Sequence, residues 1–218
     1  MDTRFNLLKK WLEDTLNNRE LLIETASADA SFRRYFRVTI GANSLIAMDA
    51  PPLQEDCRPF LRLARLLKEL KVHTPEVHAE DLDQGFILLE DLGNQDYLDN
   101  LGDTSKADTL YGQAIEALLK LQQGDITQVE PYTEEKLKQE MSLFKDWYLE
   151  KHLSQPMSDK AATAWANLQN RLCKACTEQP IAWVHRDFHS RNLMITEENN
   201  PGVIDFQDLV AGNLKSPP

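Results

Sequence analysis

Residues 185–192 read His-Arg-Asp-Phe-His-Ser-Arg-Asn, and residues 203–206 read Val-Ile-Asp-Phe. Between them, residues 198–202 read Glu-Asn-Asn-Pro-Gly, a turn signal that predicts a hairpin of two short strands. A hairpin returns the chain on itself, so we expect Asp205 to lie beside Asn192. The pattern H-x-D-x-x-x-x-N, followed by an apolar hairpin and Asp-Phe, is far more specific than the alternative interpretation, a surface turn with an unremarkable strand end.

Three side chains in this stretch suit the transfer of a phosphoryl group from a nucleotide. That reaction needs a carboxylate that orients and deprotonates the attacking hydroxyl, and oxygen ligands that hold magnesium on the phosphates. Asp187, which we expect in a loop with its carboxylate free, fits the first role. The amide oxygen of Asn192 and the carboxylate of Asp205 are hard ligands that suit magnesium. His189 is a candidate substrate contact, with a structural histidine held by hydrogen bonds as the more frequent alternative.

Composition and charge narrow the class of partner. The chain has 218 residues, of which 42% are hydrophobic and 27% are charged, as is ordinary for a globular protein with a sizeable core. Its net charge of −11 disfavours nucleic acid and anionic membranes as partners, because both repel an acidic surface. Residues 1–16 lack the continuous apolar run of a signal peptide, and no later stretch is long enough to cross a bilayer. We therefore expect a cytoplasmic protein.

The hydrophobic pattern changes near Gly93 and predicts two lobes of different kinds. Before this residue the pattern predicts an antiparallel sheet with helices, the helices at 4–17 and 60–70 and the strands at 21–23, 32–40, 44–48, 77 and 86–89. After it the pattern predicts long helices at 105–123, 133–152 and 158–177, with short strands at 183–184, 193–196 and 203–205. The expected fold class is α+β and bilobal. Residues 1–92 are expected to form an N-terminal nucleotide-binding lobe, and residues 93–218 a C-terminal helical catalytic lobe.

Two segments of the first lobe are candidates for contact with a nucleotide. Residues 88–93 join the lobes, and an extended connector exposes main-chain N–H and C=O groups that can read an adenine edge. Residues 30–36 precede and enter a strand, where a hydroxyl, amides and an arginine can cover phosphates. Alternation along a strand places neighbouring side chains on opposite sides, so at most one of two adjacent arginines points at phosphate. The alternatives are a plain linker and a charged edge strand. The candidate nucleotide-binding residues are Ser31, Phe32, Arg33, Arg34, Glu90 and Leu92.

These residues resemble the aminoglycoside phosphotransferase and choline kinase family, small-molecule kinases that share the protein-kinase fold. The resemblance runs from about Glu24 to the end of the chain and rests on residues 29–38, 48–52, 88–93, 185–192 and 204–208. Together these segments look most like the bacterial N-acetylmuramate/N-acetylglucosamine kinases, which phosphorylate a sugar at its anomeric hydroxyl during cell-wall recycling. The resemblance implies ATP and Mg²⁺ as cofactors, Asp187 as catalytic base, Asn192 and Asp205 as magnesium ligands, and a hinge at Glu90–Leu92.

Two features of the chain depart from this family pattern. Protein-kinase-like folds usually carry a lysine on the third strand, whereas residues 45–49 read Leu-Ile-Ala-Met-Asp. We therefore hypothesise that Arg33 or Arg34 makes the phosphate contact. The resemblance also implies a further stretch of helices after Asp205 that builds much of the acceptor pocket, so we expect the helical lobe to be incomplete. The alternatives that stay open are an aminoglycoside or choline phosphotransferase and a truncated, non-catalytic nucleotide-binding module.

Overall fold

The computed structural model describes residues 3–28 and 32–213. The chain forms two compact units, and neither unit is contiguous in sequence. Unit 1 takes residues up to 118 together with residues 188–207, and unit 2 takes residues 119–187 together with those from 208 onward. The functional division into lobes at residues 1–92 and 93–218 stays a prediction.

The sheet of unit 1 is antiparallel throughout, as the sequence predicts. Its strand order is β1-β2-β3-β5-β4, and its strands are β1 (Leu22–Ala28), β2 (Arg34–Ile40), β3 (Asn43–Asp49), β4 (Val77–Asp81) and β5 (Phe86–Glu90). The turn between β2 and β3 is tight, since Ile40 pairs with Asn43 and Gly41 takes a positive φ of 60°. Only glycine adopts such a φ without steric cost, which explains the turn at this position.

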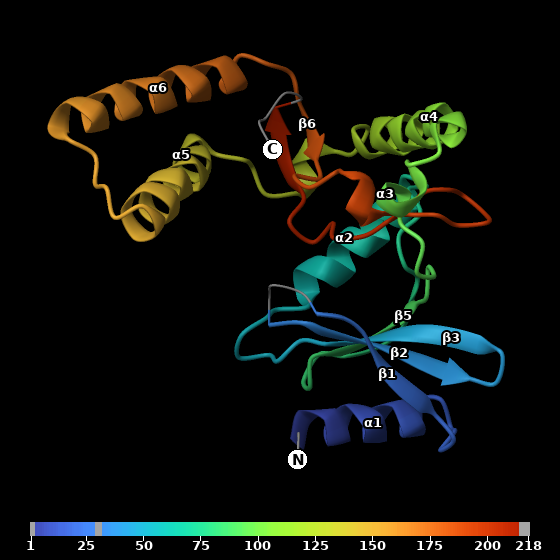
Figure 1. Ribbon diagram of the computed structural model, residues 1–218. Coiled ribbons are helices and arrows are strands. Elements are labelled where there is room, and N and C mark those ends of the chain that lie inside the picture. The colour runs from blue at the N-terminus through green and yellow to red at the C-terminus, as the bar shows by residue number, and fades with distance from the viewer. Residues whose placement is uncertain (1–2, 29–31, 214–218) are drawn as a thin grey trace. The chain divides into compact units, whose positions relative to one another are not determined.

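One face of this sheet is covered by α1 (Thr3–Thr15) and the other carries α2 (Arg58–Glu69) (Figure 1). Leu8 and Leu12 lie one helical turn apart on α1 and are fully buried. The core on that side takes alternate residues of the strands, as a sheet with one buried face requires. Its strand members are Phe36, Val38, Ala47, Phe86 and Leu88.

The rest of unit 1 surrounds the predicted hairpin, which is confirmed. The hairpin strands are β7 (Leu193–Met194) and β8 (Gly202–Val203), and they pair antiparallel. Their neighbours are α3 (Tyr97–Asn100), α4 (Thr104–Leu121), whose last residues belong to unit 2, and the 3₁₀ turn η3 (Ser190–Asn192). The strands are shorter than the predicted ranges 193–196 and 203–205, because the ladder ends before Asp205, whose φ is 63°.

Unit 2 is mainly helical. Its elements are η1 (Ile126–Gln128), α5 (Glu134–Leu143), η2 (Phe144–His152), α6 (Asp159–Thr177), β6 (Ile181–Val184) and β9 (Val210–Asn213). The predicted helix at 133–152 continues without a break but changes from α to π geometry at Phe144. The core of this unit contains Tyr132, Leu137, Cys173, Cys176 and Val210. In the described part of the chain, no helix is both long and apolar enough to cross a membrane.

Candidate active site

The hairpin of unit 1 brings Asn192 and Asp205 together, as the sequence predicts. Asn192 Nδ2 donates a hydrogen bond to Asp205 Oδ2 at 3.3 Å. The main chain holds the same pair in register, because the amide of Ile204 donates to the carbonyl of Asn192 at 3.1 Å. With Nδ2 turned towards Asp205, Oδ1 is the atom of the Asn192 amide that can act as a metal ligand.

Asp205 is held in an uncommon backbone conformation. Its φ of 63° lies in the left-handed region, where aspartate is tolerated better than most residues. Gln207 Nε2 donates to Asp205 Oδ1, and the next residue, Phe206, is fully buried. The Phe206 ring stacks on Phe60 of α2, with ring centroids 4.9 Å apart and an interplanar angle of 28°. The buried ring fixes the chain beside Asp205, and strained backbone of this kind gathers at functional sites.

The chemistry of this pair fits magnesium rather than a metal with an all-protein cage. Among residues 3–28 and 32–213, no group of three or more His, Cys, Asp and Glu side chains is arranged to hold a metal ion. Magnesium at a nucleotide site is usually bound by one or two protein oxygens, and phosphates and water complete its octahedron. One amide oxygen and one carboxylate are therefore a sufficient donor set for this ion.

Asp187 is the last residue of the 119–187 stretch of unit 2 and lies in the loop between β6 and η3. Its side chain is exposed, whereas His185 two residues earlier is only 1% exposed. Arg186 has a positive φ of 76° and pairs with Glu140 of α5 at 2.6 Å. The Asp187 side chain is thus exposed, and the two residues before it in the loop are held in place.

His189 lies in unit 1 as the residue before η3, and its side chain is exposed. Its carbonyl accepts a hydrogen bond from the amide of Asn192 at 2.9 Å. The main chain of His189 therefore shapes the turn that presents Asn192, and the side chain is accessible to a ligand.

The connector at 88–93 is tied to β2 by an ion pair that the sequence analysis did not find. Arg37 donates from Nε to Asp91 Oδ2 at 2.6 Å and from Nη2 to Oδ1 at 3.0 Å. Arg37 also donates to the carbonyl of Gly93 at 2.9 Å, and the Gly93 amide donates to Asp91 Oδ1. Burial raises the pKa of Asp91, but the hydrogen bonds from Arg37, Ser44 and the Gly93 amide outweigh it and leave this pKa below its usual range. This bidentate pair fixes the path of the connector.

Within the connector, Glu90 and Leu92, the two predicted nucleotide contacts, have different neighbours. The Glu90 carboxylate accepts a hydrogen bond from the amide of Glu76 at 3.1 Å. The Leu92 side chain packs on the hairpin, where a Cβ added to Gly202 would come within 2.7 Å of Leu92 Cδ1. Among hydrogen bonds between described residues, none engages the main-chain amide or carbonyl of Leu92. The main chain of Leu92, rather than the Glu90 carboxylate, is therefore suited to an adenine edge.

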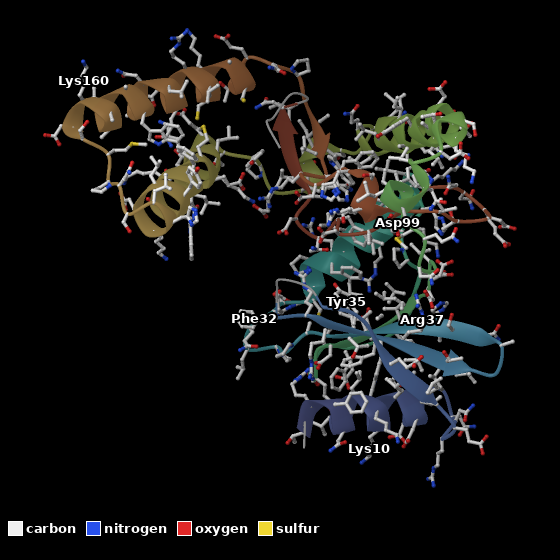
Figure 2. The ribbon with its side chains drawn as sticks, viewed as in Figure 1. Lys10, Phe32, Tyr35, Arg37, Asp99 and Lys160 are labelled. Atoms are coloured by element: carbon white, nitrogen blue, oxygen red, sulfur yellow. The ribbon has the colours of Figure 1, made fainter. Side chains whose placement is uncertain are left out.

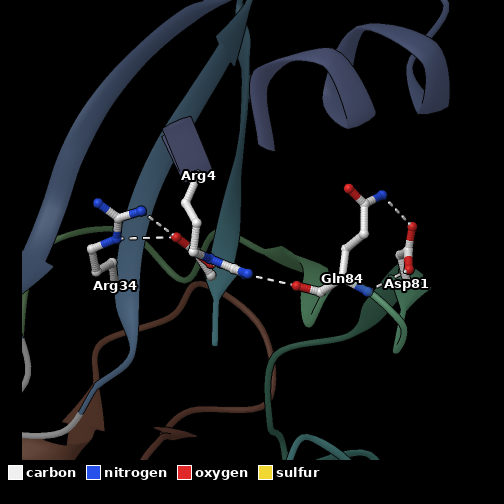
Figure 3. A network of polar contacts seen from close by, with 5 residues as sticks. Arg4, Arg34, Asp81 and Gln84 are labelled. Carbon is white, nitrogen blue, oxygen red and sulfur yellow. Dashed lines mark hydrogen bonds and ion pairs between the residues drawn. The ribbon is translucent and has the colours of Figure 1, made fainter. Parts of the chain in front are cut away.

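Arg34 is engaged on the side of the sheet that faces α1. Its Nε donates to Asp49 Oδ2 at 3.0 Å, and Arg4 of α1 donates to Asp49 Oδ1 at 2.9 Å. Asp49 is completely buried between these two cations. Figure 3 shows how Arg4 continues the network to the carbonyl of Gln84, at 2.7 Å. Arg34 is thus part of a structural network around a buried carboxylate, although its own side chain is 38% exposed.

Arg33 lies on the side opposite to Arg34 and pairs with Glu55, which precedes α2, at 3.2 Å. Its side chain is 14% exposed. Tyr35 and Arg37 follow at alternate positions on β2, and Figure 2 labels both. The neighbouring candidate Phe32 is 61% exposed, and Ser31 lies outside the described residues.

Sequence reasoning missed the carboxylates that hold the arginines: Asp49, Glu55, Asp91 and Glu140. Three of these four pairs join residues more than 20 positions apart, and the fourth joins neighbouring strands. One signal was available, because Arg34 and Asp49 occupy opposed positions in a hairpin predicted from its turn.

Residues 23–214 match the sequence profile of the phosphotransferase enzyme family. The chain is 45% identical over 224 residues to an N-acetylmuramate/N-acetylglucosamine kinase of Pseudomonas aeruginosa, and the match covers 97% of this chain and 65% of that protein. A kinase of the same name from Neisseria meningitidis is 37% identical, with coverages of 95% and 63%. The chain thus spans less than two thirds of the length of these relatives.

Solved structures confirm the fold class. The ADP-bound aminoglycoside phosphotransferase APH(2'')-Ib matches 98% of this chain and 73% of its own, with a TM-score of 0.67 and 16% identity. The choline kinase LicA of Streptococcus pneumoniae matches 96% of this chain and 70% of its own, with a TM-score of 0.66 and 12% identity. At these identities the likeness concerns the fold, which is the expected protein-kinase-like α+β fold.

Proposed function

The chain belongs to the phosphotransferase enzyme family, and from this premise we propose that it is an ATP- and magnesium-dependent small-molecule kinase. It transfers the γ-phosphate of ATP to a hydroxyl of a sugar. The acceptor we propose is the anomeric hydroxyl of an N-acetylated amino sugar, in cell-wall recycling. Such a kinase works where ATP is, in the cytoplasm.

One observation carries the choice of acceptor. Two relatives that match 95% or more of this chain, at 45% and 37% identity, are named N-acetylmuramate/N-acetylglucosamine kinases. The aminoglycoside and choline phosphotransferases resemble the chain in fold at 16% and 12% identity, which does not extend to the acceptor. An N-acetylated amino sugar is therefore the acceptor class to test first.

The proposed roles follow the chemistry of each group. Asp187 orients the acceptor hydroxyl and takes its proton, a role that the exposure of this residue supports. Asn192 and Asp205 hold magnesium, and their hydrogen bond of 3.3 Å supports a shared ligand set. When bound, the ion neutralises charge on the phosphates. His189 is a proposed contact for the acceptor, supported by its exposed side chain.

The nucleotide is proposed to meet the connector and the start of β2. The main chain of Leu92, two residues after Glu90, reads the adenine edge. Arg33 supplies positive charge to the phosphates, in place of the lysine that β3 lacks. Both arginines are paired, Arg34 with Asp49 and Arg33 with Glu55. The support for Arg33 is that, by alternation along the strand, it lies on the same side as Arg37, which binds Asp91 of the connector. Ser31 and Phe32 belong to the same segment and stay proposed contacts.

An assay of ATP consumption against a panel of acceptors tests this proposal. We expect ADP release with N-acetylmuramate or N-acetylglucosamine and none with an aminoglycoside or choline, and a ³¹P resonance typical of an anomeric phosphate. Release with an aminoglycoside or choline alone would favour the alternative acceptors. Binding of magnesium-ATP without turnover on any acceptor would favour a non-catalytic nucleotide-binding module.

The substitution Asp187→Asn tests the base directly. General-base catalysis contributes about 10²- to 10⁴-fold, so we expect kcat to fall by that order while the affinity for magnesium-ATP stays nearly unchanged. Asp83→Asn, in the exposed turn between β4 and β5, is the matched control and should leave kcat unchanged. Full activity of Asp187→Asn would refute the assignment.

A further inference from the structure

The loop that carries Asp187 is held by a cluster of polar side chains around Arg186. Arg186 adopts a φ of 76°, in the left-handed region that residues other than glycine seldom enter. A conformation of this kind persists only where surrounding contacts compensate for its cost. The contacts of Arg186 therefore indicate what holds the loop.

Glu140, in the last turns of α5, supplies the shortest of these contacts. Arg186 Nη2 lies 2.6 Å from Glu140 Oε1, a charge-assisted hydrogen bond. The side chains of Arg186 and Glu140 are 24% and 31% exposed, so solvent screens the pair only in part. Arg186 Nη1 also lies 3.8 Å from Asp208 Oδ1, but the Asp208 side chain is 62% exposed and contributes less.

Tyr132 holds the other side of Glu140 and covers Arg186. Its hydroxyl donates to Glu140 Oε2, and the Arg186 guanidinium lies over its ring, 5.8 Å from the centroid. Tyr132 is only 9% exposed, and its amide donates to the carbonyl of Ala211 in β9 at 2.8 Å. Burial and the adjacent Glu140 carboxylate raise the pKa of Tyr132 to about 12, so its hydroxyl remains a donor at neutral pH.

We propose that Glu140, backed by Tyr132, is a positioning residue that holds Arg186 in its left-handed conformation and thereby fixes the Asp187 carboxylate for catalysis. The proposal rests on the proposed function of Asp187. Both carboxylate oxygens of Glu140 are bound, one by Tyr132 and one by Arg186. Arg186 is held through its guanidinium, and Asp187 is the next residue in the chain. The loss of the Glu140 carboxylate should therefore alter the position of Asp187 through the Arg186 side chain and the peptide bond between residues 186 and 187.

The test compares Glu140→Gln with Glu134→Gln, a matched substitution on the same helix. Glu134 pairs with Lys138 at 2.7 Å on the surface of α5 and is not one of the Arg186 contacts described above, so its change removes an exposed ion pair without altering them. We expect Glu140→Gln to lower kcat on the order of 10- to 100-fold, because small misplacements of a reacting group have effects of that size. The KM for ATP should change little, and Glu134→Gln should change neither parameter.

Two further measurements separate positioning from general damage to the fold. Tyr132→Phe removes only the hydroxyl donor and should lower kcat in the same direction by a smaller factor. In the double variant Glu140→Gln/Arg186→Gln, the loss should equal that of Arg186→Gln alone, since Glu140 acts through Arg186. Additive losses would overturn the proposal.

A readout independent of turnover distinguishes failure of this proposal from failure of the proposed function. The NMR order parameters of residues 186 and 187 should fall from rigid values near 0.85 in Glu140→Gln and stay unchanged in Glu134→Gln. Unchanged order parameters in Glu140→Gln would overturn the proposal, and so would lower ones with unchanged kcat. Absence of turnover by the unaltered chain would contradict the proposed function instead, and the order parameters would still decide whether Glu140 holds the loop.

Discussion

Two adjacent arginines at the start of β2 have different physical tasks. Arg34 and Arg4 together neutralise Asp49, whose side chain is completely buried. A buried carboxylate that loses one of its charged donors is destabilised, because one of its oxygens is then left without a hydrogen bond. Arg33 pairs instead with Glu55 on the other side of the sheet. The cost of removing each arginine should therefore appear in different measurements.

We predict that Arg34→Ala destabilises the fold and that Arg33→Ala weakens nucleotide binding. Removing Arg34 leaves Asp49 Oδ2 without its charged donor while Arg4 still binds Oδ1, so the free energy of unfolding should fall by about 1.5–3 kcal/mol, the range for hydrogen bonds to charged groups. Arg33→Ala should change stability less and raise the dissociation constant of magnesium-ATP about tenfold, which corresponds to the loss of one charge-assisted contact. Urea unfolding and calorimetric titration of both variants check these outcomes, and unchanged ATP affinity in Arg33→Ala would reject the role of Arg33.

For single residues, the sequence predicts which side of a strand a side chain faces, but it does not predict which distant residue that side chain contacts. Alternation along a strand predicts that Arg33 and Arg34 face opposite sides, and a short turn predicts that Asn192 meets Asp205, which the structure confirms. The contact between Arg186 and Glu140 joins residues 46 positions apart. No periodicity or turn signal encodes such a distance, because it depends on how α5 packs in unit 2.

The connector after β5 is held by the ion pair between Arg37 and Asp91. Its contribution to the free energy of unfolding should therefore depend on pH. Asp91 has a lowered pKa in the folded protein, and its side chain is 4% exposed. An aspartate whose pKa is lower when folded stabilises the protein above its unfolded pKa, about 3.9. That contribution is lost as the pH falls from about 4 through the folded pKa.

We predict that Asp91→Asn lowers the free energy of unfolding by about 1.5–3 kcal/mol at pH 7, the range for hydrogen bonds to charged groups. The difference from the unaltered chain should narrow as the pH falls below about 4. Denaturant unfolding over a series of pH values measures this. In an Arg37→Met background the pH-dependent difference should be smaller, and an equal difference in both backgrounds would show that Arg37 is not its source.

The stack of Phe206 on Phe60 joins α2 to the hairpin segment and gives a second prediction for an element. Phe206→Ala should cost about 3–5 kcal/mol of stability, because a fully buried ring leaves a cavity. Phe206→Leu should cost less, since it refills most of that volume. We also expect the affinity for magnesium-ATP to fall in the same order, because Asp205 precedes the ring. Equal stability of the two variants, measured by urea unfolding, would show that the cavity collapses.

The elements that could be predicted from the sequence are those whose hydrophobic periodicity extends over many residues or that end in a clear turn signal. The sheet strands, α1, α2 and the three long helices overlap the predicted ranges, but β1 and β4 continue to Ala28 and Asp81, beyond the predicted 21–23 and 77. Helix α3 was not predicted, because its four residues are too few to show a helical period. Strand β9 was not predicted either; it reads Val-Ala-Gly-Asn and pairs with β6, a strand about 30 positions earlier. Strands with small residues and distant partners carry little local signal.

The two units of the whole molecule interleave along the chain. Residues 188–207 complete unit 1 but follow 69 residues of unit 2, from 119 to 187. This late segment supplies Phe206 and Val203, both fully buried, and the Val203 amide donates to the carbonyl of His73 at 2.7 Å. Asn200 Nδ2 also donates to the hydroxyl of Tyr97 at 2.7 Å. Unit 1 therefore depends on residues that its first 118 do not contain.

We predict that a fragment of residues 1–118 is much less stable than unit 1 in the intact protein. Without the late segment, Phe60 loses its stacked partner, Tyr97 loses its hydrogen bond and a buried apolar surface is exposed, so the thermal transition should broaden and move to lower temperature. Joining residues 188–207 to the fragment through a flexible Gly/Ser linker restores these contacts at a modest entropic cost, because loop closure depends only weakly on length. Circular dichroism melts of both chains measure the difference. If the unlinked fragment melts as cooperatively and at the same temperature as the linked one, the hairpin is not part of the stable unit, and the neighbourhood of Asn192 and Asp205 must be held by other contacts.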